Sequence, residues 1–196
     1  STGQDPLDQL VRAVLSQSTS DSNSGRAYRD LRSRFPSWEA VLAAPEAEVA
    51  GALRTGGLAR LKAARIRGIL SAIQQHRGVI DLSFLSAMPT EEACALLARL
   101  PGVGPKTAAC VMLFALCRPV LPVDTHIYRV SRRLGLLEGP TSAERAHAAL
   151  QRLLRDDQVL SFHLNMIAHG KGVCRALLPR CTCCVLREEC ASADAA

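Results

Sequence analysis

Lysine is rare in this 196-residue sequence, and one of its three lysines lies where its amine could act as a nucleophile. Lys106 falls in the first turn of a predicted helix whose remainder, from Ala108 to Cys117, is wholly apolar and is therefore expected to be buried. The positive end of the helix dipole and partial desolvation both disfavour the ammonium and favour the neutral amine. A neutral lysine amine can form a Schiff base. The alternative is a lysine that binds phosphate or extends to solvent, which is the commoner role of lysine.

A carboxylate in the same part of the chain could assist such a lysine. Asp124 lies in the segment Pro122-Val123-Asp124-Thr125-His126, directly before another predicted helix. The simpler interpretation is a helix N-cap, which keeps the carboxylate ionised. A fixed carboxylate beside a nucleophilic lysine can also orient the amine and stabilise positive charge at a sugar carbon.

The cysteines are concentrated near one end of the chain, where five of the eight fall within residues 174–190. This distribution favours a metal site over a disulfide scaffold. Four thiolates suit zinc or an iron–sulfur cluster. Cys174, Cys181, Cys184 and Cys190 are separated by six, two and five residues, a spacing that better suits the wider [4Fe-4S] cluster. Cys183 is left over, and Arg175 and Arg180 lie on the loop between the first two ligands, where they could contact phosphate. The predicted ligands are Cys174, Cys181, Cys184 and Cys190.

The segment Leu100-Pro101-Gly102-Val103-Gly104-Pro105 joins two predicted helices by a tight turn. Its two glycines permit positive φ and the close approach of another backbone. The N–H groups of Gly102, Val103 and Gly104, with the following helix N-terminus, form a cradle for phosphate. We interpret this as a helix-hairpin-helix, which grips a DNA backbone without reading bases. An ordinary corner between two helices is the alternative.

Charge and hydropathy limit the class of protein. The net charge is +6, and residues 51–140 carry twelve basic and five acidic groups, which favours a polyanionic partner such as nucleic acid. The hydrophobic fraction of 48% excludes a disordered chain. No apolar run approaches the roughly 20 residues of a membrane helix, and the N-terminus lacks signal-peptide features, so we expect a cytoplasmic protein with no membrane partner.

Helical periodicity covers almost the whole sequence and predicts an all-α protein of about ten short helices, in one domain or two small lobes. Asp5-Pro6 predicts a helix start, and the apolar stripe that follows is Leu7, Leu10, Val11, Val14 and Leu15. We also expect a helix capped by Thr90, a capping box at 141–144, an extra turn over 82–85, and a last helix over about 157–169 that ends at Gly170.

Three motifs in order, the hairpin with Lys106, the Val-Asp-Thr-His segment and the four-cysteine run, resemble the endonuclease III family of DNA glycosylases. The resemblance implies a two-lobed helix-hairpin-helix glycosylase fold. Residues 1–118 would form a six-helix barrel with the hairpin at about 90–117, and residues 119–196 a helical domain ending in the [4Fe-4S] cluster loop. It also implies that Lys106 is the nucleophile, Asp124 the catalytic aspartate, and Leu58 a residue that wedges into the duplex.

The resemblance implies a bifunctional DNA N-glycosylase and abasic-site (AP) lyase of base excision repair. It would remove oxidised pyrimidines such as thymine glycol and nick abasic sites by β-elimination. Its partner would be double-stranded DNA with damaged bases or abasic sites, bound by a monomer associated with a prokaryotic nucleoid.

Three departures from the family pattern bear on this expectation. Ser18 stands where a Gln often fills the hole left by the flipped base, and Ser is too short to do so. The link over 79–92 is longer than in well-known members, and an N-terminal helix that normally packs on the cluster lobe is absent or trimmed. Two alternatives stay open. One is a monofunctional, mismatch-directed or uracil-directed glycosylase of the same fold, and Lys106 disfavours the monofunctional form. The other is a weakly active or non-enzymatic DNA binder, which Ser18 favours and which Lys106 and Asp124 disfavour.

Overall fold

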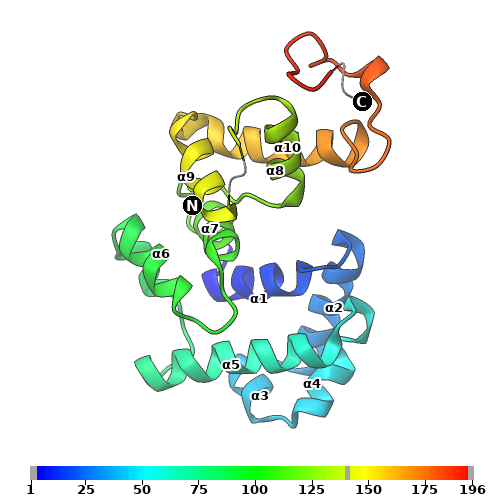
Figure 1. Cartoon of the computed structure of the whole chain (residues 1–196). Coiled ribbons are helices and arrows are strands. Elements are labelled where there is room, and N and C mark those ends of the chain that lie inside the picture. Colours follow the sequence, from blue (N-terminus) through cyan, green and yellow to red (C-terminus); the bar gives the residue numbers. More distant parts are fainter. Residues whose placement is uncertain (1–3, 140–141, 194–196) are drawn as a thin grey trace. The chain divides into compact units, whose positions relative to one another are not determined.

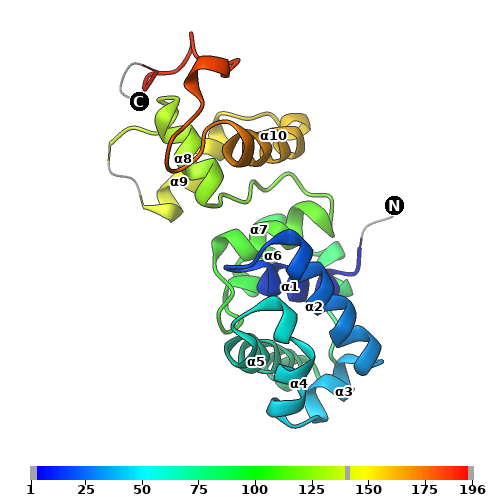
Figure 2. The ribbon, with the colours of Figure 1, turned by 90° about the vertical axis from the view of Figure 1, so that its right-hand side faces the viewer.

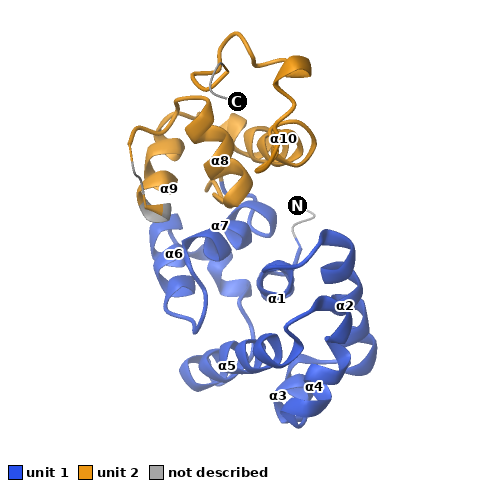
Figure 3. Ribbon diagram, turned by 45° about the vertical axis from the view of Figure 1, so that its right-hand side comes forward, with its two compact units in different colours: residues 1–118 blue, residues 119–196 orange. Residues whose placement is uncertain are grey.

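The computed structural model describes residues 4–139 and 142–193 and contains helices but no strand over those ranges (Figure 1). The chain folds into two compact units, Ser1–Arg118 and Pro119–Ala196 (Figure 3). The α-helices are α1 (Pro6–Ser16), α2 (Asp21–Arg34), α3 (Trp38–Ala43), α4 (Glu46–Ala52), α5 (Ala59–Arg77), α6 (Thr90–Ala98), α7 (Pro105–Phe114), α8 (Thr125–Arg133), α9 (Ala143–Arg152) and α10 (Val159–Gly172). The 3-10 helices are η1 (Arg54–Gly56), η2 (Ser83–Ala87), η3 (Asp156–Gln158) and η4 (Cys181–Cys183). The all-α prediction is confirmed.

The first unit is built around α1, which contacts α2, α5 and α7 (Figures 1 and 2). Its predicted apolar stripe is buried along its whole length, because α1 has neighbours on several sides. The predicted start is also confirmed: the carboxylate of Asp5 accepts hydrogen bonds of 2.9 Å from the N–H groups of Leu7 and Asp8, and Pro6 opens the helix. The extra turn expected near Leu82 is present as η2.

The second unit packs α8 against α10. Ile127 and Val130 of α8, Leu150 of α9, and Val159 and Met166 of α10 are buried and form its apolar interior. No described helix is long and apolar enough to cross a bilayer.

Two predicted helix boundaries were wrong. Thr90 is the first residue of α6, and Pro89 occupies the N-cap position, so no side chain caps this helix. The last helix continues through Gly170 to Gly172. A Cβ on Gly170 would lie 2.9 Å from the Cβ of His126, so this glycine permits close packing of α10 against α8 and does not end the helix.

The predicted capping box falls partly outside the described residues, which exclude Thr141. The N-cap of α9 is Ser142, whose hydroxyl accepts a hydrogen bond of 3.3 Å from the N–H of Arg145.

Candidate active site

The turn between α6 and α7 forms a tight hairpin, and its two glycines differ in conformation. Gly102 has a φ of +72°, a backbone angle that favours glycine, and a Cβ there would lie 2.8 Å from Cδ of Arg65, so that side chain would have to move aside. Gly104 has a φ of −93°, so of the two glycines only Gly102 adopts the positive φ that glycine permits. A Cβ on Gly104 would meet nothing within 4 Å, which leaves the N-terminal end of α7 open to the approach of another molecule.

Lys106 is the second residue of α7 and is partly buried. The residues that follow it, from Thr107 to Leu113, are all buried, as expected for a helix that is apolar on every side. The expected burial does not extend to Cys117, because α7 ends at Phe114 and Cys117 is exposed. The chain therefore holds the Lys106 backbone on a rigid element while its side chain keeps access to solvent. This is the arrangement that a nucleophilic amine needs.

A polar link that we did not predict holds the hairpin to the rest of the first unit. The Nε2 of Gln17 donates to the hydroxyl of Thr107 at 3.3 Å, and its Oε1 accepts a hydrogen bond from Arg65. Gln17 follows the last residue of α1, and Thr107 follows Lys106 in α7. A contact between residues 90 positions apart leaves no periodic signal in the sequence.

Two other predicted site residues of the first unit, Ser18 and Leu58, share an unusual conformation. Ser18 has a φ of +53° and Leu58 a φ of +49°, in the left-handed region that residues other than glycine seldom adopt. Each such residue costs about 1–3 kcal/mol of strain, which tends to collect at functional sites. Both are exposed, and 57% of the Leu58 surface faces solvent. An exposed leucine held in a strained turn is suited to insertion into an apolar environment.

In the second unit, Asp124 is the N-cap of α8. Its Oδ1 accepts a hydrogen bond of 2.8 Å from the N–H of Ile127, and the residue is partly exposed. The segment that leads to it is fixed by Gln151, whose side-chain amide accepts from the N–H of Leu121 at 2.7 Å and donates to the carbonyl of Pro119 at 2.9 Å. The carboxylate is thus held by local hydrogen bonds, and the capping interpretation is confirmed.

The four cysteines singled out by spacing all line one cavity of the second unit, with a volume of about 380 Å³. Cys183 is not among the lining residues and is exposed; its thiol lies 3.4 Å from the carbonyl of Arg180. His169 also lines the cavity, with its Nε2 3.6 Å from the Sγ of Cys184.

The cavity has a donor set for a metal group but is not a tight cage for one ion. Within residues 4–139 and 142–193, no three His, Cys, Asp or Glu side chains come together closely enough to hold a metal ion. Four thiols around a cavity of this size fit a cluster with several metal atoms better than a single ion.

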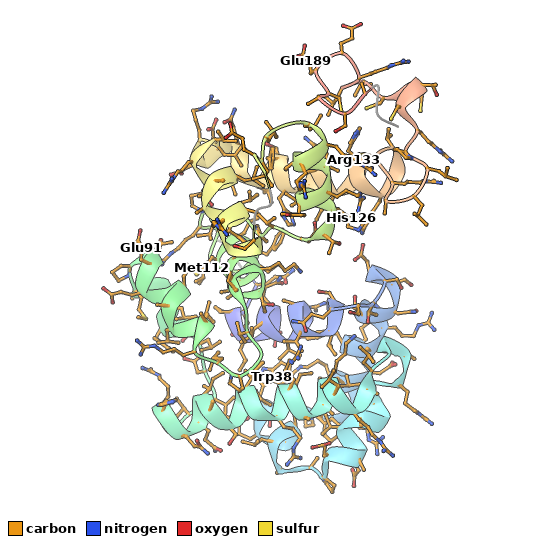
Figure 4. All side chains as sticks on the ribbon, in the orientation of Figure 1. Trp38, Glu91, Met112, His126, Arg133 and Glu189 are labelled. Atoms are coloured by element: carbon orange, nitrogen blue, oxygen red, sulfur yellow. The ribbon has the colours of Figure 1, made fainter. Side chains whose placement is uncertain are left out.

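Two arginines of α8, which we did not predict, hold the chain at the start of this cysteine segment. Arg133 projects from the C-terminal end of α8 (Figure 4), and its Nη2 donates to the carbonyl of Ala176 at 3.0 Å. Arg129 donates to the carbonyl of Cys174 at 3.0 and 3.2 Å, and to that of Gly170 at 2.8 Å. These hydrogen bonds direct both arginine side chains toward the backbone at the start of the cysteine segment.

Most of the loop between Cys174 and Cys181 is exposed, although Pro179 and Arg180 also line the cysteine cavity. Arg175 and Arg180 are exposed, as a phosphate contact would require. The tip is apolar, because Leu177 and Leu178 are 84% and 88% exposed, respectively.

Comparison with known proteins places this arrangement in a family. Residues 11–156 match the model of the HhH-GPD superfamily of base excision DNA repair proteins. A candidate DNA glycosylase of Arabidopsis thaliana is 40% identical over 84% of this chain, and the chain spans 56% of that relative's length. Endonuclease III of Thermotoga maritima is 32% identical over 95% of this chain and 83% of its own.

The structure is also similar to solved structures of endonuclease III. One of them, a trapped covalent intermediate of endonuclease III with DNA, superposes with a TM-score of 0.84 at 29% identity. The match covers 97% of this chain and 85% of the other.

Proposed function

Because the chain belongs to the HhH-GPD superfamily of base excision DNA repair proteins and is of the endonuclease III type, we propose that it is a DNA N-glycosylase with AP lyase activity. The observation that carries the proposal is the placement of Lys106. It lies directly after the open Gly104 turn, with partial solvent access, at the start of a buried helix. Its DNA partner would be double-stranded and would contain a damaged base or an abasic site.

Access to the damaged base would require the nucleotide to leave the stack, because the reacting sugar carbon cannot be reached inside a duplex. Unstacking costs a few kcal/mol and is easiest at damaged pairs. The hairpin amides at Gly102 to Gly104 would bind the phosphate backbone, as would Arg175 and Arg180 in the second unit. Leu58, exposed and held in a strained turn, would fill space in the duplex.

The chemistry would begin with attack of the Lys106 amine on C1′ of the deoxyribose. The glycosidic bond between C1′ and the nitrogen of the base breaks as the bond between Lys106 Nζ and C1′ forms. The base leaves with the electrons of the glycosidic bond and takes up a proton. Ring opening then gives a Schiff base, and loss of a C2′ proton allows β-elimination of the 3′ phosphate. Asp124, fixed as the N-cap of α8, would stabilise positive charge that develops at the sugar.

The four cysteines around the second unit's cavity would hold a [4Fe-4S] cluster, which would link four points of the C-terminal segment to one another beside α8, whose Val130 and Arg133 line the same cavity. The protein's own groups already bind this segment: Arg129 and Arg133 hold its carbonyls in place. We assign the cluster a structural role, with Cys183 outside the ligand set.

For the substrate class we propose oxidised pyrimidines such as thymine glycol. Ser18 is exposed but short, so it would leave the space of the flipped base poorly filled and lower excision efficiency. Gln17 does not take over this task in the free protein, because its amide is engaged by Thr107 and Arg65.

A cleavage panel tests the function. End-labelled duplexes that contain thymine glycol, uracil, a T·G mismatch or an abasic site are incubated with the protein, with and without later alkaline treatment. We expect release of thymine glycol and direct nicking of both the thymine glycol and abasic duplexes. Excision confined to uracil or the mismatch would show a different specificity, and binding without any cleavage would show a non-enzymatic binder.

A further inference from the structure

The most deeply buried charged side chain of the described residues lies in the first unit, on α5. Lys62 of α5 is 3% exposed, and no carboxylate within the described residues forms an ion pair with it. Burial lowers the pKa of its ammonium. Placing a methionine there would avoid this desolvation, so apolar packing does not explain a lysine at this position.

The ammonium of Lys62 makes three hydrogen bonds, each to a different segment. It donates at 2.8 Å to the carbonyl of Leu15, in the last turn of α1, where the helix dipole favours a positive charge. It donates at 2.8 Å to the carbonyl of Gly56, at the end of η1. Its third bond is to the hydroxyl of Thr19, in the loop that follows α1.

The acceptors are also connected to one another. The hydroxyl of Thr19, which accepts from Lys62, lies 2.6 Å from the carbonyl of Gly56 and can donate its own proton there. All three ammonium protons therefore have acceptors within one closed network. Such a fully satisfied buried network fixes its members in one arrangement.

The network ties together two of the segments that hold a non-glycine residue at positive φ. Thr19 follows Ser18, with φ of +53°, and Gly56 lies two residues before Leu58, with φ of +49°. Left-handed conformations of this kind persist only when surrounding contacts enforce them. Lys62 lies one helical turn after Leu58, and its own N–H donates to the carbonyl of Leu58 at 2.9 Å.

We propose that Lys62 is a positioning residue whose buried ammonium locks the Ser18 loop and the Leu58 turn together, so that both enter the DNA duplex as one preformed unit. This inference rests on the proposed function. Lys62 itself touches neither the base nor the sugar. Its effect reaches the reaction through the placement of Leu58 and Ser18.

Hydrogen exchange tests the structural half of the proposal without any activity. In Lys62→Met, the amides of residues 16–20 and 54–58 should exchange at least about 10-fold faster than in the wild type. The exchange rates of the α6 and α7 amides should stay within about twofold of the wild-type rates. Ile66→Val, a buried change one turn further along α5, is the matched control and should leave both segments unchanged. Uniformly faster exchange, or no change in the two segments, would overturn the proposal.

A double-mutant cycle tests the functional half. Under single-turnover conditions, Lys62→Met and Leu58→Ala should each slow thymine glycol excision about 10-fold or more, but Lys62→Met should add less than about twofold when Leu58 is already Ala. Borohydride trapping on a preformed abasic site should fall far less than excision in Lys62→Met, because Lys106 is intact. If the double variant excises thymine glycol more slowly by the product of the two single-variant factors, the two residues act independently and the proposal is overturned.

A milder variant covers the case in which Lys62→Met does not fold. Thr19→Val removes one acceptor of the network. It should speed amide exchange in residues 16–20 and 54–58 and slow thymine glycol excision, each by about threefold. No change in either measurement would count against the proposal. If the wild-type protein neither excises a base nor forms a trapped adduct, the proposed function fails. Hydrogen exchange then still decides whether Lys62 links the two segments.

Discussion

The guanidinium of Arg133 lies 3.3 Å from the Sγ of Cys174 and donates a hydrogen bond of 2.6 Å to the carbonyl of Arg175. Arg133 is the last residue of α8, and Asp124 is the N-cap of the same helix. One nine-residue helix therefore connects the candidate catalytic carboxylate to the cysteine segment. We expect loss of order around the cysteines to reach Asp124 through α8.

The first prediction concerns the metal group. Purified protein should be brown and contain about four irons per chain, as expected for a four-thiolate cluster. Cys184→Ala should lose iron and solubility, because Cys184 lines the cavity, whereas Cys183→Ala should keep both. Iron analysis and the visible absorption spectrum measure this. A colourless zinc protein, or equal damage from the two substitutions, would show that the ligands were assigned incorrectly.

The second prediction separates the two roles of Asp124. Asn caps a helix almost as well as Asp, so Asp124→Asn should keep the bond to the Ile127 N–H and the melting temperature. Without the negative charge, base excision should fall about 10²-fold or more. Asp124→Ala should in addition lose about 1 kcal/mol of stability. A stable and fully active Asp124→Asn would limit this residue to capping.

The third prediction concerns the hairpin. Gly104 has an ordinary φ and open space at its Cβ position, so Gly104→Val should leave the free protein stable. A valine there would obstruct an approaching phosphate backbone and should weaken binding to undamaged, abasic and lesion duplexes alike. Gly25→Val, on α2, is the control that should leave binding unchanged. Fluorescence anisotropy over a salt series should also show affinity falling steeply with salt. If Gly104→Val weakened binding to only one lesion duplex, the hairpin would not bind the phosphate backbone independently of the lesion.

The fourth prediction concerns stability in alkali. Burial, with a hydrogen bond and repulsion from Asp8, raises the pKa of Tyr28 from 10.0 to about 12. The neutral phenol is therefore favoured by folding, so this contribution is fully present below pH 10 and is lost as the pH rises toward 12. Tyr28→Phe keeps the ring beneath Arg12 but removes the titration. Urea unfolding should show that the wild-type advantage over Tyr28→Phe shrinks from pH 10 to pH 12; a constant difference would refute this.

Local sequence signals predicted the elements that carry the site. The Asp5 cap, the buried stripe of α1, the start of α7 at Pro105 and the Asp124 cap each depend on residues a few positions apart, so short-range patterns reveal them. Gly170 shows the limit of such patterns. Its requirement for glycine comes from His126 on another helix, and the sequence alone made it look like a helix end.

The polar contacts around the site could not be predicted in this way. Gln17 reaches Thr107, Lys62 reaches Leu15, and Arg133 reaches Cys174 across 90, 47 and 41 positions, respectively. Each joins elements whose pairing is decided by packing of the whole unit. A polar residue on a helix gives no indication of which distant carbonyl or hydroxyl it will meet.

Borohydride trapping on a duplex with one abasic site tests the central claim, that Lys106 is the nucleophile. The wild-type protein should form a stable covalent adduct with the DNA. Lys171→Gln, a change of an exposed lysine on α10, should trap equally well. Lys106→Gln keeps the hairpin amides, so it should bind the duplex as tightly as the wild type or more tightly, yet form no adduct and cleave no strand. An undiminished adduct in Lys106→Gln would contradict the account.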